Sequence, residues 1–394
     1  MCESNPKENY SLSLFYTTPN NQSRVIIISH PDQKETNEIL IPESISVTST
    51  QLKIATFNLF NYLEPPNAYY DFERIYSKAQ WEKKQRWITD YLHEYQPDII
   101  GFQEVFSPES LKGLVVAQGY DYFEVVDQPD VIDDFIYRSP VVAIASRYPI
   151  VEVAAVKPNA ELAETLGLAN DFSFSRKVLR ATVEMPHLGK CDCYVVHFKS
   201  KRSMIELDET DKSRSPEKTI IESLKAQVAG SWGSTIKRGS EATLLMIDMI
   251  ERREATGNPM VLMGDFNNTL SDGILSHLLT NTLRFVSSID RDAYLAKYCL
   301  NDAWNLFEVA VINEASEADL EEKPIRKPTH YFGAGSSVLD YILLSCEFDA
   351  SYHDSLYQVS GYDTYDRHLI NPIFERDGES TDHGIVLVTF TLRS

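Results

Sequence analysis

Positive charge is scarce in this sequence of 394 residues. Its 37 lysines and arginines stand against 58 aspartates and glutamates, which gives a formal net charge of −21 and a pI of about 4.8. A protein that grips nucleic acid over a broad face needs clustered basic residues to neutralise phosphates. The composition therefore argues against such a surface. It does not exclude a phosphate ester as substrate, because one metal ion can supply positive charge locally.

Long apolar runs are also missing. No run approaches the roughly 18 apolar residues expected of a membrane-spanning helix. The N-terminal residues MCESNPKENYSLSLFYTT contain no basic region followed by a long apolar one, as a secretory signal would. We therefore expect a cytoplasmic protein with no membrane span, and we favour a monomer.

Cysteine is scarce too, with an odd total of five residues. Cys191 and Cys193 would lie on the same face of a strand, as a metal or redox pair might require. No second pair stands nearby to complete a zinc site, so reduced thiols in a packed core are the favoured interpretation.

The hydrophobic content of 43% is typical of a globular protein with a sizeable core. Short runs rich in Val, Ile and Tyr predict strands, at residues 25–29, 52–58, 98–104, 141–146, 179–185, 191–198, 260–266, 338–345 and 384–392. Apolar residues at helical spacing predict helices at 78–95, about 216–228 and 240–254. Many strands with a few long helices indicate a mixed α/β sandwich.

Two kinds of segment differ from this pattern. Residues 1–50 are rich in Thr, Ser and Asn, and we expect them to form a β-rich extension packed on a main domain of residues 51–394. Polar, aromatic-rich insertions at 63–75, 203–217 and 352–379 interrupt the main domain. Loops of that length are usually either mobile or functional.

Polar residues that can bind metal ions or phosphate stand at or near the ends of six predicted strands. They are Asn58, Glu104, His197 with Lys199, Asp265 with Asn267, Asp340, and Asp382 with His383. A single carboxylate at a strand end is ordinarily solvated, and a single Asp-His pair is ordinarily a turn. Six such positions on core strands instead indicate one site.

Hydrolysis of a phosphate ester would use these residue types. A hard divalent cation takes oxygen ligands such as those of Glu104 and Asn58, and it offsets charge in the transition state. Asp265 is the candidate to orient or deprotonate the attacking water. Asn267, two residues further on, would point the same way and could donate a hydrogen bond to phosphate.

The last two strand-end residues can form a further pair. A histidine beside a buried carboxylate is held in one tautomer and is favoured as imidazolium. Asp340 and His383 are the candidates for this pair, although Asp340 could instead simply cap its strand.

The ordered set of Asn58, the QE ending at Glu104, His197, GDFN ending at Asn267, LDYI and TDH ending at His383 resembles the endonuclease/exonuclease/phosphatase superfamily. This superfamily includes DNase I-like and exonuclease III-like enzymes, and the resemblance covers roughly residues 52–394. It implies an α/β fold that is a four-layer α/β/β/α sandwich of two mixed β-sheets flanked by helices. The site would lie at one end of the two sheets.

The resemblance also implies roles for the site residues. Glu104 would hold Mg²⁺ or Mn²⁺, with Asn58 and Asp382 close by, while Asp265 and Asn267 would serve the nucleophile and the phosphate.

By the same resemblance, Asp340 would orient His383, and His197 would contact phosphate or transfer a proton. A structural histidine in the core is the alternative for His197. Unlike secreted DNases, the chain lacks a signal peptide, disulfides and an obvious basic stripe.

The segment from residue 176 to residue 238 differs in charge from the rest, with 13 basic against 8 acidic residues. Lys199 and Arg238 lie in it and are candidate phosphate-binding residues, the alternative being a solvated loop and helix. The HFKSK run, which contains Lys199, resembles a subset of bacterial nucleases.

We therefore expect a divalent-metal-dependent phosphodiesterase that cleaves nucleic acid or nucleotides. The alternative is a phosphatase or phosphodiesterase on a small-molecule or lipid-headgroup phosphate, of the inositol phosphate or sphingomyelin type. A binding module that has lost catalysis is disfavoured, because no catalytic carboxylate or histidine is missing.

Overall fold

The computed structural model describes residues 12–17, 23–28, 51–169, 171–205, 215–279, 294–314 and 323–393. The chain divides into two compact units, residues 1–49 and 50–394. In the first unit, β1 (Leu12–Thr17) and β2 (Ser23–Ile28) pair as an antiparallel hairpin. The expected packing of the extension on the main domain stays a prediction.

The second unit is built on two six-stranded mixed sheets. The first sheet has the order β18 (Tyr357–Tyr365), β19 (Ile385–Leu392), β3 (Gln51–Tyr62), β5 (Ile99–Val105), β9 (Val141–Ser146), β6 (Tyr122–Val125). The second sheet has the order β10 (Ile150–Ala155), β11 (Leu179–Met185), β12 (Gly189–His197), β13 (Met260–Asp265), β17 (Asp340–Leu344), β14 (Asn301–Asp302). Parallel pairs join β3 to β5 and β12 to β13.

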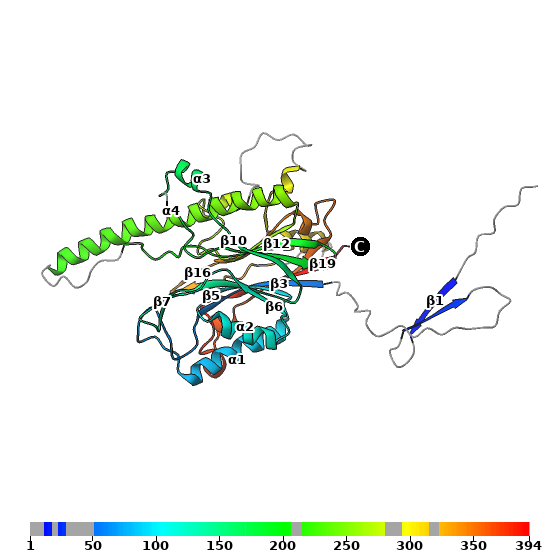
Figure 1. Ribbon diagram of the computed structural model, residues 1–394, viewed down its shortest axis with the longest axis horizontal. Helices are drawn as coiled ribbons and strands as arrows, with labels where there is room; N and C mark the ends of the chain where they lie inside the picture. The colour runs from blue at the N-terminus through cyan, green and yellow to red at the C-terminus, as the bar shows by residue number, and fades with distance from the viewer. Residues whose placement is uncertain are drawn as a thin grey trace, which may run out of the picture. The chain divides into compact units, whose positions relative to one another are not determined.

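Helices cover the outer face of each sheet, so the unit has four layers (Figure 1). On the first sheet lie α1 (Lys78–Tyr95) and α2 (Pro108–Ala117). On the second lie α3 (Ala160–Thr165) and α4 (Pro216–Thr256).

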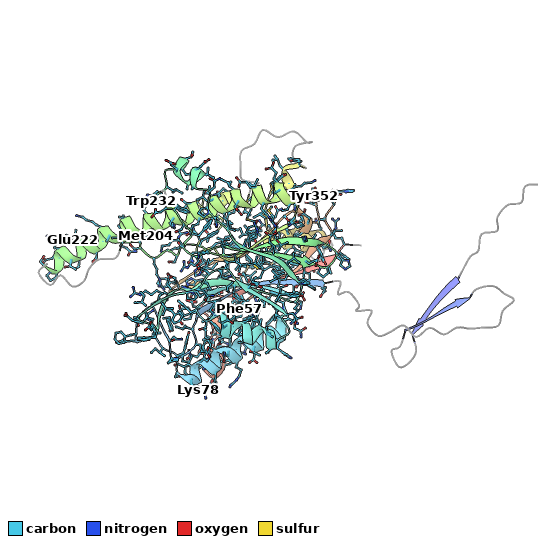
Figure 2. The ribbon with its side chains drawn as sticks, viewed as in Figure 1. Phe57, Lys78, Met204, Glu222, Trp232 and Tyr352 are labelled. Carbon is cyan, nitrogen blue, oxygen red and sulfur yellow. The ribbon has the colours of Figure 1, made fainter. Side chains whose placement is uncertain are left out.

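Three apolar cores fill the spaces between these layers. Successive side chains of a strand point to opposite faces, so β3 contributes to the cores on both sides of its sheet. Ile54 packs between the sheets, whereas Phe57 packs against Trp87 of α1 on the outer side of the first sheet (Figure 2). The expected α/β/β/α sandwich is confirmed.

Smaller elements connect the layers. A three-stranded sheet has the order β4 (Ala68–Tyr69), β8 (Ile136–Ser139), β7 (Asp130–Ile132), and β15 (His330–Phe332) pairs with β16 (Gly335–Ser337). The remaining helices are α6 (Ala303–Glu314), α7 (Arg367–Ile370) and α8 (Phe374–Asp377), with 3₁₀ turns η1 (Ser276–Leu278) and η3 (Cys346–Phe348).

The helix expected at residues 78–95 has those bounds, and a capping box at Ser77 starts it. The two helices expected at 216–228 and 240–254 are instead one helix, α4, of 41 residues. The glycines between them do not break it. A Cβ on Gly230 would lie 1.8 Å from the Ser203 Oγ, so this glycine permits close packing against the segment that follows β12.

The insertion expected at residues 352–379 was wrong in part, because it contains β18, an edge strand of the first sheet. Cys191 and Cys193 are buried in the core between the sheets, as the reduced-thiol interpretation requires. Within the described ranges, no helix is both long and apolar enough to cross a membrane.

Candidate active site

Strand register brings the predicted strand-end residues to one end of both sheets. The parallel strands β12 and β13 pair His197 with Asp265, the last residue of each. The antiparallel strand β17 begins at Asp340, which pairs with Asp265. In the first sheet, the parallel strands β3 and β5 carry Asn58 and Glu104 near their carboxyl ends. Sequence positions more than 200 residues apart thus meet.

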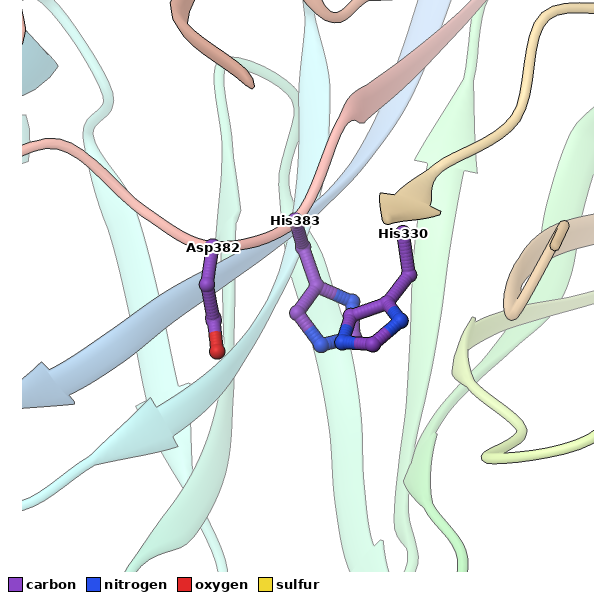
Figure 3. A group of neighbouring side chains, drawn as sticks. All are labelled: His330, Asp382 and His383. Carbon is purple, nitrogen blue, oxygen red and sulfur yellow. The ribbon is translucent and has the colours of Figure 1, made fainter. Parts of the chain in front are cut away.

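The turn before β19 adds Asp382 and His383, and Figure 3 shows them beside His330 of β15. One ligand atom from each of these three side chains lies within 4.8 Å of the others. Thr381 fixes this turn on β3, because its Oγ1 donates to the Asn58 carbonyl at 2.7 Å and accepts from the His383 N–H at 3.1 Å. His330 was not predicted, whereas the other two site residues were.

The glycine of the GDFN motif is required by close strand packing. Gly264 has φ 149°, and a Cβ there would lie 2.0 Å from the Val196 carbonyl oxygen. Any larger residue would push β13 away from β12 and displace Asp265 from its place beside His197.

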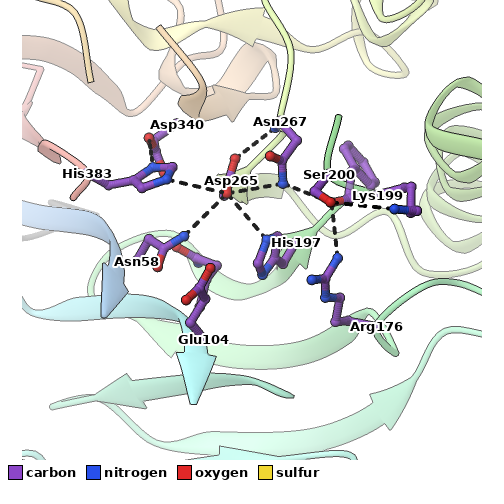
Figure 4. Close-up of polar contacts among 12 residues, drawn as sticks. Asn58, Glu104, Arg176, His197, Lys199, Ser200, Asp265, Asn267, Asp340 and His383 are labelled. Atoms are coloured by element: carbon purple, nitrogen blue, oxygen red, sulfur yellow. Dashed lines mark hydrogen bonds and ion pairs between the residues drawn. The ribbon is translucent and has the colours of Figure 1, made fainter. Parts of the chain in front are cut away.

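Asp265 is the centre of the site (Figure 4). Its Oδ2 accepts from the Asn58 Nδ2 at 3.3 Å, a hydrogen bond between the two sheets, and its Oδ1 accepts from the Asn267 N–H at 2.7 Å. The Nε2 atoms of His197 and His383 lie 3.4 and 3.9 Å from Oδ2. One buried carboxylate therefore faces two imidazoles.

The two histidines differ in protonation. Burial lowers the pKa of His383, but the Asp340 carboxylate, 2.8 Å from its Nδ1, and Asp265 outweigh burial and raise this pKa well above the ordinary value. Burial and the nearby charge of Arg176 lower the pKa of His197 well below its ordinary value. Burial raises the pKa of Asp265 to about 7, although His383 opposes this shift. Near neutral pH, His383 is thus an imidazolium and His197 a neutral imidazole.

Glu104 forms the acidic side of the site. Its Oε2 accepts from the Asn61 N–H at 2.9 Å, and burial together with Asp382 raises the pKa of Glu104. The buried Asn61 Oδ1 has no hydrogen-bond partner among the described residues. Neighbouring carboxylates and an amide oxygen left without a donor form a donor set that fits a hard divalent cation.

Left-handed backbone conformations cluster here. The non-glycine residues Phe60, Asn61, Tyr70, Glu104 and Asn267 have φ values of 50°, 56°, 66°, 59° and 53°. Such conformations cost energy and persist where the surrounding structure imposes them, often at functional sites. The cluster supports the assignment of this end of the sheets as the site.

Basic side chains also lie near the site, and we call Arg176, Lys199, Lys201 and Arg202 the basic rim. Beside the larger effect of burial, the charge of Arg176 acts to lower the pKa of both Glu104 and His197, and that of Lys201 acts to lower the pKa of His330. The Arg176 Nη1 donates to the Phe198 carbonyl at 3.5 Å, and the Arg202 guanidinium lies 6.0 Å from the centre of the Tyr70 ring. Arg176 was not predicted as a site residue. Its signal in the sequence is only its place at the start of the basic segment.

Arg238 and Asn267, two of the predicted phosphate contacts, form hydrogen bonds within the protein. Arg238 is buried, and its Nη1 donates to the Lys199 carbonyl at 2.8 Å. The Asn267 Nδ2 donates to the Phe198 carbonyl at 3.0 Å and to the Asp265 Oδ2 at 3.2 Å. The Lys199 Nζ is closer to solvent and donates to the Arg202 carbonyl at 3.3 Å. All three phosphate contacts stay predictions.

A third residue near the site that the sequence did not predict is Lys84 of α1. Its side chain is 1% exposed, and its Nζ donates to the Ser380 carbonyl in the loop before Asp382 at 3.1 Å. Burial lowers its pKa to about 8, against the opposing effect of Asp382 and Glu104. A lysine at helical spacing between Trp81 and Ile88 was a usable signal.

A cavity of about 330 Å³ adjoins the site. Another cavity, of about 390 Å³, lies away from the site, beside Arg253 and Tyr294. Phe60, Tyr69 and Tyr76 line the adjoining cavity together with residues of the loop at 378–380. Its walls are the end of β3, the segment from β4 to the start of α1, and the loop that leads to Asp382. A group attached to a phosphate in the site could enter this cavity.

Comparisons with known proteins agree with this architecture. A model of the endonuclease/exonuclease/phosphatase family matches residues 55–353. No curated protein sequence matches the chain.

Similar solved structures include the human Nocturnin catalytic domain with bound sulfate, at 17% identity and TM-score 0.49 over 87% of this chain and 95% of that chain. A humanized D. rerio TDP2 matches at 13% identity and TM-score 0.48, over 87% of this chain and 100% of that one. A mannosyl-6-phosphatase of Bacteroides thetaiotaomicron VPI-5482 matches at 17% identity and TM-score 0.47, over 86% of this chain and 99% of that one. These values are too low to transfer a substrate to this chain.

Proposed function

The chain belongs to the endonuclease/exonuclease/phosphatase family, whose members hydrolyse phosphoric esters, and from this premise we propose that it is a divalent-metal-dependent phosphodiesterase. Its substrates would be nucleic acid or nucleotides. The observation that carries the proposal is Asp265, a buried carboxylate between a neutral and a protonated histidine and within hydrogen-bond reach of both sheets.

Asp265 is proposed as the base that orients the attacking water and takes its proton. Burial raises the pKa of Asp265 to about 7, and a base is most effective when its pKa lies near the working pH. The hydrogen bonds from Asn58 and Asn267 hold the carboxylate in a fixed orientation.

His383 is proposed to stabilise the phosphoryl group. Asp340 keeps the ring protonated through the Nδ1 contact. As an imidazolium, His383 carries both N–H groups, and the Nδ1 contact orients the ring so that the Nε2–H is directed toward the centre of the site. There it can donate to a phosphoryl oxygen whose charge grows in the transition state. His197, which is neutral, can donate or accept a proton there.

Glu104, Asn58 and Asp382 are proposed to hold the cation, Mg²⁺ or Mn²⁺, with His330 as a further donor beside Asp382. When bound, such a cation polarises a phosphoryl oxygen and offsets developing charge. Lys84 supports this side by fixing the loop before Asp382.

The basic rim is proposed to contact the phosphodiester. Its four basic side chains suit a few phosphates rather than a long duplex, which agrees with the net charge of −21. We expect Arg176 and Lys199 to bind the non-bridging oxygens.

A substrate panel tests the proposal. Plasmid DNA, single-stranded DNA, RNA, bis-nitrophenyl phosphate and nitrophenyl phosphate would be assayed with Mg²⁺, Mn²⁺ and EDTA. We expect metal-dependent cleavage of the diesters, and loss of it in Asp265→Asn and His383→Ala. The matched controls are Asp354→Asn and His353→Ala, whose side chains are 76% and 100% exposed. Unchanged activity in the two site variants would show that the site is assigned wrongly.

The cavity lined by Phe60 and Tyr76 favours a second candidate, hydrolysis of a small-molecule or lipid-headgroup phosphate. Its volume of about 330 Å³ suits one compact group better than a polymer. Inositol phosphates and sphingomyelin added to the panel separate the two candidates, because a preference for them over every nucleic acid would favour the second.

A further inference from the structure

Large apolar side chains are exposed on the outer side of the N-terminal half of α4. They are Ile220, Ile221, Leu224, Val228, Trp232 and Ile236, with exposed fractions of 68, 53, 63, 65, 64 and 45%. We call this set the α4 stripe. Charged and polar residues normally occupy the solvent side of a surface helix, so a continuous apolar stripe of this length indicates an interaction surface.

The α4 stripe faces away from the body of its own unit. Gly230 accepts the Met204 N–H at its carbonyl, and a Cβ on Gly233 would lie 3.5 Å from the Met204 sulfur. These glycines mark the inner face. Because successive residues turn by about 100°, Val228 and Trp232 lie on the opposite side from Gly230. This half of α4 also extends past the ends of the sheets (Figures 1 and 2).

We propose that the α4 stripe binds the α4 stripe of a second copy of this chain, with the two helices antiparallel about a two-fold axis at Val228. The spacing carries this proposal. Leu224 and Trp232 lie four residues on either side of Val228, and Ile220 and Ile236 lie eight. Residues four apart form one ridge of a helix, and two such ridges pack at a crossing angle of about 50°. This packing places Leu224 against Trp232 and Val228 against itself, with Ile220 and Ile236 flanking the crossing. The stripe is thus self-complementary, as a two-fold interface requires.

The size of the stripe also fits a second copy. Six large side chains that are each about half exposed offer on the order of 600 Å² per copy, so the pair reaches about 1,200 Å², the lower end of specific interfaces. The two bodies would lie on opposite sides of the helix pair, because each inner face is turned to its own unit.

Charge argues against a membrane as the occupant. Residues 216–236 contain Glu217 and Glu222 against Lys218 and Lys225, so this half of α4 is balanced. Helices that lie on anionic bilayers instead carry an excess of lysine and arginine on the polar face. The proposal revises the monomer that the sequence favoured.

Pairing of the two helices would also stabilise the segment that carries the basic rim. The Ser234 Oγ donates to the Arg202 carbonyl at 2.5 Å, and Glu241 accepts from the Lys199 N–H at 2.7 Å. The helix that would form the interface therefore holds the segment that carries the basic rim.

Sedimentation velocity of the full chain over a range of concentrations tests the proposal. We expect a dimer, and we expect Val228→Glu, which places two carboxylates on the axis, to raise the dissociation constant at least tenfold. The matched control Val116→Glu on α2, where Val116 is 50% exposed, should leave it unchanged. A wild-type chain that is monomeric at every concentration would overturn the proposal, as would a Val228→Glu variant that dimerises like the wild type.

Disulfide trapping tests the direction of the helices. Val228→Cys should form an intermolecular disulfide above the background of the native cysteines. Ile220→Cys alone should not, because the two copies of this position would be about 24 Å apart along the axis at 1.5 Å per residue. Leu224→Cys combined with Trp232→Cys should cross-link, because these two positions face each other beside the axis. A disulfide in Ile220→Cys alone would overturn the antiparallel arrangement, and flotation of a monomeric chain with anionic vesicles would overturn the second copy as occupant.

Discussion

Replacing Asp265 with asparagine should stabilise the metal-free protein while it abolishes activity. Burial raises the pKa of this carboxyl from 3.8 to about 7 in the folded state, so ionisation at alkaline pH opposes folding. A shift of three pKa units corresponds to about 4 kcal/mol. The variant would lose part of this gain, because the contacts with Asn58, Asn267 and His383 become weaker. We expect a net stabilisation of about 2 kcal/mol above pH 7.

The pH dependence of folding stability determines whether the variant is more or less stable than the wild type. Below about pH 3, the carboxyl is protonated in both the folded wild type and the unfolded chain, so its titration costs little. Between about pH 4 and 7 the folded state binds the extra proton, and wild-type stability falls as the pH rises. The Asp265→Asn variant lacks this titration. The difference between variant and wild type should therefore grow up to about pH 7 and stay constant above it.

Urea unfolding in EDTA at pH 5 and pH 8 measures this difference, with Asp354→Asn as the control. We expect the Asp265→Asn variant to be about 2 kcal/mol more stable than wild type at pH 8 and nearly equal at pH 5. Phosphodiesterase activity with metal should fall by at least about 10³. A difference in stability that does not grow between the two pH values would refute the reasoning, since it would show that Asp265 ionises without cost in the folded protein.

Four further outcomes follow from the same geometry. Glu104→Gln should raise the Mg²⁺ concentration for half-maximal activity by about 10- to 100-fold, as a metal titration of the rate would show. Asp340→Asn removes the carboxylate that raises the pKa of His383, so the alkaline limb of the kcat/KM profile should move to lower pH. Arg176→Ala should raise KM about tenfold with a smaller change in kcat, because a charged hydrogen bond to the ground-state phosphate is worth about 1.5 kcal/mol or more. Phe60→Ala should raise KM for diesters that carry a bulky group on the phosphate, and not for methyl-substituted ones, in a comparison of steady-state rates.

The sequence could predict the site where chemistry and strand pattern coincide. His197 and Asp265 end two apolar runs, and such runs pair in parallel when a helix connects them. Their carboxyl ends then share one edge, as the register of β12 and β13 shows. The same logic places Asn58 and Glu104 together on β3 and β5. These residues could be found because each one lies at or near the end of the apolar run that forms its strand.

Other site residues could not be found in this way. Arg176 reaches the site from the segment before β11, and His330 comes from the short strand β15, so neither follows a long apolar run. Their positions depend on tertiary contacts between loops, which no local pattern encodes. The continuity of α4 was missed for a related reason, because Gly230 serves close packing against Ser203 rather than a helix end.

The Asp340 carboxylate gives the two histidines of the site different pKa values. His197 and His383 are both buried and both face Asp265, so burial alone would leave both rings neutral. Among the described residues, His383 has a second carboxylate, 2.8 Å from its Nδ1, and His197 has none. The pKa values of the two rings are shifted in opposite directions as a result. A phosphate in this site would meet a fixed positive charge on the Asp340 side and a neutral proton donor or acceptor on the side of the basic rim. If Asp340→Asn leaves the pH profile unchanged, the charge must come from elsewhere, and this division of roles is wrong.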